Sequence, residues 1–240
     1  MEKKLIVITG ASSGIGKATA IAFSKEDYPL LLLARRIDII KKLNLPNTIC
    51  AEVNVSDYDS FESALKIAEA RFGPTDCIIN NAGVMFLENF YEQEPDEWKK
   101  MFDTNVIGML NGIKLVLKGM IVRETGTIVN VGSTAGKRTF LYHAAYCGTK
   151  FAVHALTESI REEVADRNIR LVCIAPGVTE TELLKNTKSK DIISDYNEWK
   201  ISIGGGLDPK YIADAILYAY KLPQNICARE IIIAPTQQAT

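Results

Sequence analysis

Short, uninterrupted runs of apolar residues recur along the chain, separated by longer segments with the apolar spacing of helices. An uninterrupted run of this length suits a strand that is buried on both faces, as in a parallel sheet. Such runs predict strands at residues 5–8, 30–33, 77–79, 127–131, 170–175 and 231–234, with a weaker one at 48–53. Helical spacing predicts helices at residues 16–25, 58–71, 96–122, 144–164 and 209–220.

The regular alternation of strand and helix predicts the fold class. Strand–helix–strand units build parallel sheets, and right-handed crossovers bring the carboxyl ends of the strands to one edge, where ligands bind. We therefore expect a doubly wound α/β fold, with a parallel sheet of about seven strands and helices on both faces. The helical segment 96–122 is long enough for two helices, or for one helix bent near Gly108 or Gly119.

Domain organisation is simple, because the chain contains no repeat, low-complexity segment or domain linker. We predict a single domain over residues 1–240. One long polar stretch, residues 184–206, interrupts the alternation before the last helix and ends in Gly204, Gly205 and Gly206. Long excursions from compact domains are often mobile covers of binding sites, so we expect a substrate-binding lid with a glycine hinge.

The charge balance argues against nucleic acid and membrane partners. The formal net charge is -1 at pH 7, and the two signs are mixed along the chain. The first apolar run is too short for a signal peptide, and we expect that no stretch approaches the roughly 18 apolar residues of a membrane span. We therefore expect a cytoplasmic protein. The five cysteines are irregularly spaced, which favours buried, reduced thiols over disulfides or zinc ligands.

The first strand runs into a glycine-rich turn at residues 9–16, T-G-A-S-S-G-I-G, and a helix follows. Gly10 permits the tight turn, Gly14 lets the backbone approach a pyrophosphate, and Gly16 lets the helix pack against the strand. The free N–H groups of the helix start would face the phosphate charge. An ordinary strand-to-helix turn is the alternative, but this turn lies where a dinucleotide-binding turn is required.

The end of the second strand bears on which cofactor would bind. Chains that bind NAD carry an acidic residue here for the ribose hydroxyls. In this chain Ala34 takes that position, and Arg35 and Arg36 follow. Guanidinium groups suit a phosphate dianion, so we expect NADP(H) to be preferred over NAD(H). The alternative is that both arginines begin the next helix on the surface.

Further motifs lie at the ends of the later strands. They are residues 80–83 (N-N-A-G), Asn105 within 103–106 (D-T-N-V), Ser133, residues 146–150 (Y-C-G-T-K) and residues 176–181 (P-G-V-T-E-T). Tyr146 and Lys150 are four apart, so on a helix they share a face. Together with the glycine-rich turn, these motifs resemble the short-chain dehydrogenase/reductase family over essentially the whole chain. The resemblance implies a Rossmann fold and an NADP(H)-dependent oxidoreductase.

The resemblance implies a catalytic tetrad of Ser133, Tyr146, Lys150 and Asn105. Tyr146 would donate a proton to a carbonyl oxygen. In the reverse reaction, alcohol oxidation, its phenolate would be the base. Lys150 would lower the pKa of Tyr146 and bind the nicotinamide ribose. Ser133 would bond the substrate oxygen, and Asn105 would hold a water linking Lys150 to solvent.

The resemblance also assigns the residues that would bind the cofactor, and one position departs from the family pattern. Members often have Asp-Val after the third strand, where this chain has Asn54-Val55. The expected cofactor residues are Gly10, Ser12, Ser13, Gly14, Ile15, Gly16, Arg35, Arg36, Asn54, Val55, Asn81, Ala82, Gly83, Tyr146, Lys150, Pro176, Gly177, Thr179 and Thr181.

The substrate would be a small secondary alcohol or its carbonyl form, such as a hydroxy acid, aldehyde or ketone, held between Ser133, Tyr146 and the segment 184–206. We predict no metal site, because neither His143 nor His154 has a partner at metal spacing. His143 could line the pocket mouth. Members of the family commonly form dimers and tetramers through the corresponding helices, so the resemblance implies a homodimer or homotetramer through helices 96–122 and 144–164. A non-enzymatic NADP(H) sensor on the same fold is the alternative.

Overall fold

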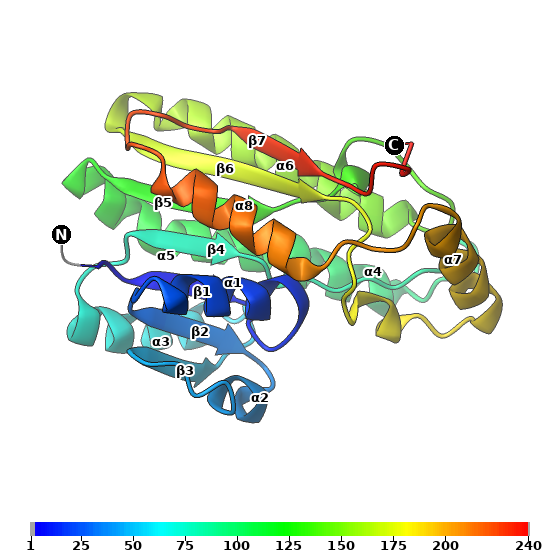
Figure 1. Cartoon of the computed structure of the whole chain (residues 1–240), viewed down its shortest axis with the longest axis horizontal. Helices are drawn as coiled ribbons and strands as arrows, with labels where there is room; N and C mark the ends of the chain where they lie inside the picture. The colour runs from blue at the N-terminus through cyan, green and yellow to red at the C-terminus, as the bar shows by residue number, and fades with distance from the viewer. Residues whose placement is uncertain (1–2, 240) are drawn as a thin grey trace.

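In the computed structural model, which describes residues 3–239, seven parallel strands form one sheet in the order β3-β2-β1-β4-β5-β6-β7 (Figure 1). The strands are β1 (Ile6–Thr9), β2 (Leu30–Ala34), β3 (Thr48–Glu52), β4 (Cys77–Asn80), β5 (Gly126–Val131), β6 (Ile169–Pro176) and β7 (Glu230–Ile233). Each predicted strand is present, within one residue of its predicted bounds. The doubly wound α/β prediction is confirmed.

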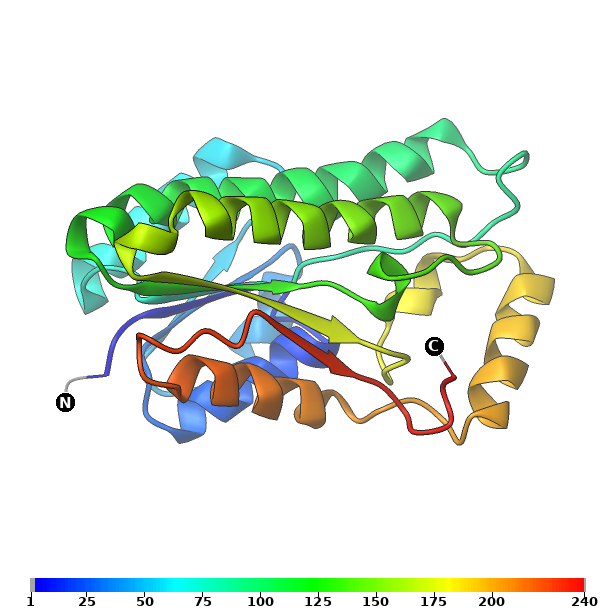
Figure 2. The ribbon, with the colours of Figure 1, turned by 90° about the horizontal axis from the view of Figure 1, so that it is seen from above.

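Helices connect the strands on both sides of the sheet. They are α1 (Gly14–Lys25), α2 (Ile37–Lys41), α3 (Tyr58–Phe72), α4 (Pro95–Phe102), the π-helical turn η1 (Asp103–Ile107), α5 (Gly108–Arg123), α6 (Ala144–Glu163), α7 (Lys190–Ser202) and α8 (Pro209–Lys221). There are also three short 3₁₀ turns among the described residues: η2 (Thr134–Gly136), η3 (Ala165–Arg167) and η4 (Leu183–Asn186). Helices α5 and α6 lie side by side over one face of the sheet, and α1 and α8 lie over the other (Figure 2).

Two apolar cores result, because successive residues of a strand point to opposite faces. Leu31 and Leu33 of β2 pack toward Phe61 of α3 and the residues of α5 and α6 on one face. Leu32 packs toward Phe23 of α1 and the residues of α8 on the other. All of these side chains are fully buried, and burial of a side chain this size contributes about 1.5–3 kcal/mol. Strands buried on both faces explain the continuous apolar runs.

The strand order reverses at β1 and β4, which are neighbours in the sheet although β2 and β3 lie between them in the chain. Such a switch point leaves a crevice beyond the carboxyl ends of the two strands, where doubly wound proteins bind ligands. Gly10 follows β1 there, and Asn81 follows β4. The side-chain amide of Asn81 donates to the carbonyl oxygen of Thr9 at 2.9 Å, so the two strand ends are tied together.

The predicted helix 96–122 is a single helical rod whose register changes in η1, directly before Gly108. By length and composition, the rod Pro95–Arg123 is apolar enough to cross a membrane, contrary to the expectation that no segment reaches this limit. Its buried residues, among them Ile113 and Val116, belong to the core against the sheet. A core helix passes the same test, so this finding is weak evidence for a membrane span.

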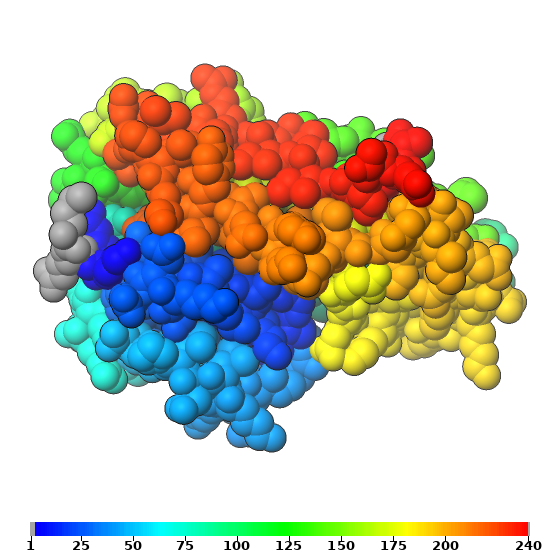
Figure 3. Space-filling view, viewed as in Figure 1, coloured from blue at the N-terminus to red at the C-terminus, as the bar shows by residue number. Residues whose placement is uncertain are grey.

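The polar segment 184–206 is more ordered than the sequence suggested, since it contains most of η4 and the whole of α7. In Figure 3 its atoms, yellow to gold, project at one end of the molecule and adjoin the blue atoms of the N-terminal part. A short parallel bridge between Thr179 and Leu207 closes the base of the excursion. Gly204 and Gly205 have φ of +81° and +93°, in the region that favours glycine.

Candidate active site

A single large cavity of about 1160 Å³ opens at the carboxyl ends of the strands and runs beneath the segment 184–206. It brings together nearly every residue that the sequence analysis selected. Those that line it are Gly10, Ser12, Ser13, Gly14, Ile15, Arg35, Arg36, Asn54, Val55, Asn81, Ala82, Gly83, Ser133, Tyr146, Lys150, Pro176, Gly177, Thr179 and Thr181. Gly16 and Asn105 do not line it.

The glycine-rich turn is built so that side chains cannot replace its glycines. A Cβ on Gly16 would lie 2.4 Å from the carbonyl oxygen of Gly10, and a Cβ on Gly10 would lie 2.8 Å from the Cα of Ala82. Gly14 has φ of +51°, and a Cβ at this position would lie 2.9 Å from the side chain of Thr181. Ser13 caps α1 without a side-chain hydrogen bond. The first N–H groups of α1 therefore remain available to an anion, which fits a dinucleotide pyrophosphate.

The two arginines after β2 differ in their contacts. The guanidinium of Arg36 donates to the hydroxyls of Ser12 and Ser13, both at 3.1 Å, and forms an ion pair with Glu182 at 2.9 Å. Arg35 is exposed, lines the cavity, and has no hydrogen bond or ion pair within residues 3–239. Arg36 thus connects the glycine-rich turn to the segment before η4, whereas Arg35 is free to receive a ligand.

The expected adenine side of the cavity is bounded by Asn54, Val55 and the segment after β4. The Oδ1 of Asn54 accepts a bond from the Ser56 N–H at 3.3 Å, so its acceptor oxygen is partly used within the turn. The hydroxyl of Thr9 accepts bonds from the N–H groups of Asn81 and Ala82, at 2.9 and 3.0 Å. These bonds hold the 81–83 segment against the glycine-rich turn.

Tyr146 and Lys150 lie on the inner face of α6, each 7% exposed, and Ser133 follows β5 opposite them. Burial raises the pKa of the Tyr146 phenol, and a side-chain hydrogen bond with Ser133 opposes that rise. Burial lowers the pKa of Lys150 to about 8. Desolvation penalises the charged form of each group, so the protein alone does not lower the pKa of Tyr146 as the resemblance implied.

Asn105 has a contact pattern that the sequence did not predict. Its amide donates to the carbonyl of Val84 at 2.9 Å and to the hydroxyl of Thr149 at 3.1 Å. Its Oδ1 accepts from the Val84 N–H at 2.8 Å. The side chain, 3% exposed in η1, therefore clamps the segment after β4 to α6. Both amide protons are used, and the water-holding role remains a prediction.

The segment after β6 forms the floor at the expected nicotinamide end. The N–H of Gly177 donates to the carbonyl of Ile233 at 2.7 Å, and the Thr179 hydroxyl donates to the carbonyl of Gly177 at 3.0 Å. The side-chain oxygen of Gln238 accepts from the Val178 N–H at 2.9 Å, and its amide donates to the Thr134 hydroxyl at 3.3 Å. The C-terminal segment thus joins this floor to the Ser133 loop.

The far end of the cavity has an aromatic wall formed by Phe140, His143, Tyr196 and Trp199. Only His143 among them was expected at the pocket mouth from the sequence, and it lines the cavity. Each ring contacts the next, with centroid separations between 5.5 and 6.4 Å. The ring of His143 also meets that of Tyr146 at 6.1 Å. Tyr196 and Trp199 follow Ile192 at helical spacing, which was the available signal for α7.

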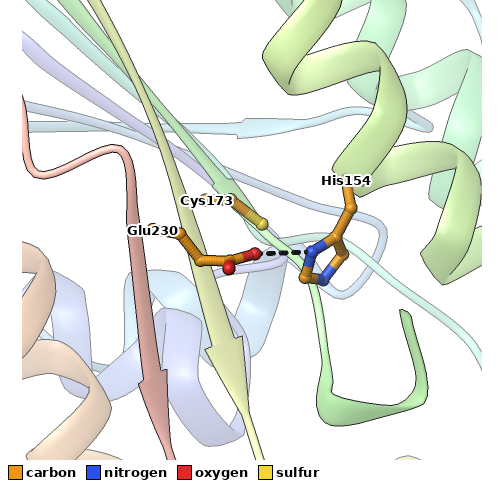
Figure 4. A group of neighbouring side chains, drawn as sticks. All are labelled: His154, Cys173 and Glu230. Atoms are coloured by element: carbon orange, nitrogen blue, oxygen red, sulfur yellow. Dashed lines mark hydrogen bonds and ion pairs between the residues drawn. The ribbon is translucent and has the colours of Figure 1, made fainter. Parts of the chain in front are cut away.

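Behind Ser133, outside the cavity, the structure brings His154, Cys173 and Glu230 together (Figure 4). Their possible ligand atoms all lie within 4.8 Å of one another. The three residues come from α6, β6 and β7, so their proximity is not visible in local sequence spacing. All five cysteines are free thiols, with Cys77, Cys147 and Cys173 buried, as predicted, and Cys50 and Cys227 partly exposed.

Known proteins match this chain over its whole length. An uncharacterized oxidoreductase of Staphylococcus saprophyticus is 37% identical over 245 residues, covering 100% of this chain and 98% of the relative. An uncharacterized oxidoreductase of Listeria monocytogenes is 35% identical, covering 99% and 98%. A glycine betaine reductase of Emericella nidulans is 33% identical over 98% of this chain, which matches only 19% of that longer protein.

Solved structures agree in fold. An alcohol dehydrogenase of the archaeon Thermococcus sibiricus, complexed with 5-hydroxy-NADP, has a TM-score of 0.87 and 28% identity, covering 100% of this chain and 99% of that one. The closed form of a serine dehydrogenase complexed with NADP+ has a TM-score of 0.90 at 24% identity, covering 98% and 96%. The short chain dehydrogenase family model matches residues 4–192. This chain is therefore an oxidoreductase of the short-chain dehydrogenase/reductase family.

Proposed function

We propose that this chain transfers a hydride between NADP(H) and an alcohol/carbonyl pair. The observation that carries the proposal is the convergence of Ser133, Tyr146 and Lys150 on one cavity whose other end is the glycine-rich cradle. A sensor would need the cradle alone. Two buried groups with pKa values pushed in opposite directions are typical of a site for proton transfer.

The protein residues would complete the reaction on the oxygen side. The bound cofactor supplies or accepts the hydride at the substrate carbon. In reduction, the hydroxyls of Ser133 and Tyr146 would bind the carbonyl oxygen, and Tyr146 would give it the proton. In oxidation, the Tyr146 phenolate would take the alcohol proton while Ser133 holds the oxygen. Lys150 would supply positive charge near the phenol, since its Nζ lies 5.7 Å from the centre of that ring.

The preference for NADP(H) rests on Arg35. It is exposed beside the cavity and lacks a partner within residues 3–239, so it can pair with a 2′-phosphate. Ala34, at the end of β2, offers no carboxylate for the ribose hydroxyls of NAD(H). Two solved relatives are complexed with NADP+ and 5-hydroxy-NADP, which is consistent with this choice.

The segment 184–206 would act as the lid over the substrate. Ile192 is buried among residues near the reacting end, and Glu180 accepts bonds from the Gly206 N–H and from Lys200, both at 3.0 Å. These contacts hold α7 against the cavity. A closed lid excludes water from the hydride and proton transfers.

The aromatic wall would hold the substrate group next to the reacting carbon. Burial lowers the pKa of His143, which favours the neutral form of its ring. Tyr and Trp rings bind alkylammonium groups through cation–π contacts, worth about 2 kcal/mol when desolvated. The guanidinium of Arg138 already lies 4.8 Å from the Phe140 ring centre, which leaves His143, Tyr196 and Trp199 to the substrate. The glycine betaine reductase relative supports an alkylammonium carbonyl substrate.

Two aldehydes of equal shape test this substrate class. Betaine aldehyde carries a trimethylammonium group, and 3,3-dimethylbutanal carries a neutral tert-butyl group of the same shape. We expect kcat/KM for NADPH-dependent reduction to favour betaine aldehyde by about tenfold, the equivalent of 1.4 kcal/mol. Loss of this preference in Trp199→Leu would support the wall. Equal or better turnover of the neutral aldehyde would reject the alkylammonium assignment.

Assembly is proposed to use the outer face of the long helices. Phe102 and Ile107 on the α4–η1 rod and Phe151 on α6 are 41%, 44% and 42% exposed. Exposed apolar side chains grouped on neighbouring helices suit a subunit interface. Light scattering should give the mass of a dimer or tetramer at micromolar concentration, and a monomer would reject this proposal.

A further inference from the structure

His154 extends the line of functional side chains on α6. Tyr146, Lys150 and His154 are spaced by four residues, so all three face the sheet. The Nε2 of His154 lies 3.1 Å from the carbonyl oxygen of Ser133 and 3.4 Å from its backbone nitrogen. One ring nitrogen therefore contacts both backbone polar atoms of the residue whose hydroxyl faces the substrate site.

The Ser133 loop is shaped around this imidazole ring. A Cβ on Gly132 would lie 2.5 Å from the Nε2 of His154, and a Cβ on Gly136 would lie 2.4 Å from its Cδ2. Real Cβ atoms do not approach so closely. Glycines on both sides of Ser133 thus let the loop close over the ring, and the position of the ring fixes the position of the loop.

The other side of the ring is held by a charged pair. The Nδ1 of His154 lies 2.8 Å from Glu230 Oε1 (Figure 4). The other carboxylate oxygen of Glu230 pairs with Lys137 at 2.8 Å. Glu230 is in register with Cys173 of the neighbouring strand. Because a carboxylate only accepts hydrogen bonds, the proton of the neutral ring is placed on Nδ1.

Contacts within the protein already engage the polar groups around the ring. Burial raises the pKa of the Cys173 thiol to about 11, so it is protonated at neutral pH. The ammonium of Lys137 already neutralises Glu230.

We propose that His154, held by Glu230 and Lys137, is a positioning residue that sets the orientation of Ser133 through its two backbone polar atoms. The proposal rests on the role given to Ser133 under the proposed function. It acts through the backbone, since His154 does not line the cavity.

The protonation state of His154 decides which of these two bonds forms. In the neutral ring, Nε2 has a lone pair and accepts from the Ser133 N–H. In the imidazolium, Nε2 carries a proton and can only donate, to the Ser133 carbonyl 3.1 Å away, so the bond from the Ser133 N–H is lost. The proposal therefore predicts that activity falls as the pH drops through the pKa of His154.

Three charged or titratable groups surround the ring in addition to Glu230: Lys137 after η2, Cys173 on β6 and Lys150 one turn earlier on α6. Burial lowers the pKa of His154, Glu230 raises it and Lys137 lowers it. The two members of one ion pair thus act on the imidazole in opposite directions. A purely structural ion pair would give both variants the same defect.

The test compares Glu230→Gln with Lys137→Gln in the full chain. With only two histidines in the chain, proton NMR of the untagged protein resolves both imidazoles, and His143→Asn assigns them. We expect the His154 pKa to fall by about one unit in Glu230→Gln and to rise in Lys137→Gln. The acid limb of kcat for carbonyl reduction, the direction in which Tyr146 reacts as the neutral phenol, should move in the same two directions, and Cys173→Ala should leave it in place.

His154→Gln supplies the positioning test. The acid limb should disappear in this variant, and kcat should fall while the affinity for NADPH, measured by fluorescence, stays within about twofold of the wild type. An acid limb that persists in His154→Gln, or that shifts alike in both ion-pair variants, would overturn the proposal. The NMR titration does not depend on turnover. An inactive wild type would therefore refute the proposed function, while the effects of Glu230 and Lys137 on the His154 pKa could still be measured.

Discussion

The ammonium of Lys150 lies 2.8 Å from the carbonyl oxygen of Val131, whereas the centre of the Tyr146 ring is 5.7 Å away. The lysine is thus anchored to the end of β5, and under the proposed function it would act on the phenol through space. A buried cation at this distance still favours the phenolate, because the interior screens charge less than water does.

The first prediction concerns Lys150→Met and the pH profile of alcohol oxidation. The phenolate of Tyr146 is the expected base, and burial raises the pKa of that phenol, so the rate should rise with pH. Removing the lysine cation should raise the apparent pKa of this limb by about one unit or more, with a loss of at least about tenfold at pH 7. Steady-state oxidation rates across pH measure it. An unchanged profile would show that Lys150 has no electrostatic role.

The second prediction separates the two arginines. Arg35→Asp should raise the Kd for NADPH by well over tenfold, because a charge-assisted phosphate contact is lost, and should leave the Kd for NADH little changed. Arg36→Ala should weaken both cofactors alike, since Arg36 supports Ser12 and Ser13. Fluorescence titration measures all four constants. Equal losses for both cofactors in Arg35→Asp would contradict its phosphate-reading role.

The third prediction concerns the hinge of the lid. Gly205 has φ of +93° and open space around its Cβ position, so Gly205→Ala introduces backbone strain without a clash. We expect faster proteolysis within 184–206 and a higher KM for substrate.

The matched control for the hinge is Gly73→Ala, since Gly73 has φ of +81° and equally open space at the end of α3. It should lower stability without changing either readout. A rise in KM of the same size in both variants would assign the effect to general destabilisation.

The fourth prediction concerns the buried Arg170 of β6, which is 4% exposed. Its guanidinium donates to the carbonyls of Tyr220 and Leu222 at the end of α8, at 2.9 and 2.7 Å, and to the Thr127 hydroxyl. Arg170→Met leaves these buried acceptors without donors. We expect a loss of about 2 kcal/mol and a Tm lower by about 4–8 °C. The control variant Arg167→Met, at an exposed position, should have the Tm of the wild type in a calorimetric scan. If Arg170→Met has that same Tm, the stabilising role of Arg170 is refuted.

The fold could be predicted because strands buried on both faces consist of continuous apolar runs, which are visible in the local sequence. Helix α7 was missed because only Ile192 of its residues is buried, and its polar composition resembles a loop. A bend near Gly108 was among the expectations, but its π-helical form was not, and the turn contains Asn105, whose side chain clamps Val84 through contacts that local spacing does not reveal.

The site was predictable where its residues form local motifs. Gly10, Tyr146 and Lys150 are found from spacing within a few positions. The pairing of His154 with Glu230 spans 76 positions, and only the parallel pairing of β6 with β7 brings Glu230 to the sheet face beneath α6. Local sequence patterns do not predict contacts between residues this far apart in the chain.

The most direct test of the central claim is turnover in the wild type and in Tyr146→Phe. NADPH oxidation and NADP reduction would be followed by absorbance with small aldehydes, ketones, 3-hydroxy acids and amino alcohols. We expect turnover that falls at least about a thousandfold in Tyr146→Phe, within the range for loss of a general acid, while NADPH binding is kept. Tight NADPH binding without turnover of any substrate, or turnover that survives in Tyr146→Phe, would contradict the central claim.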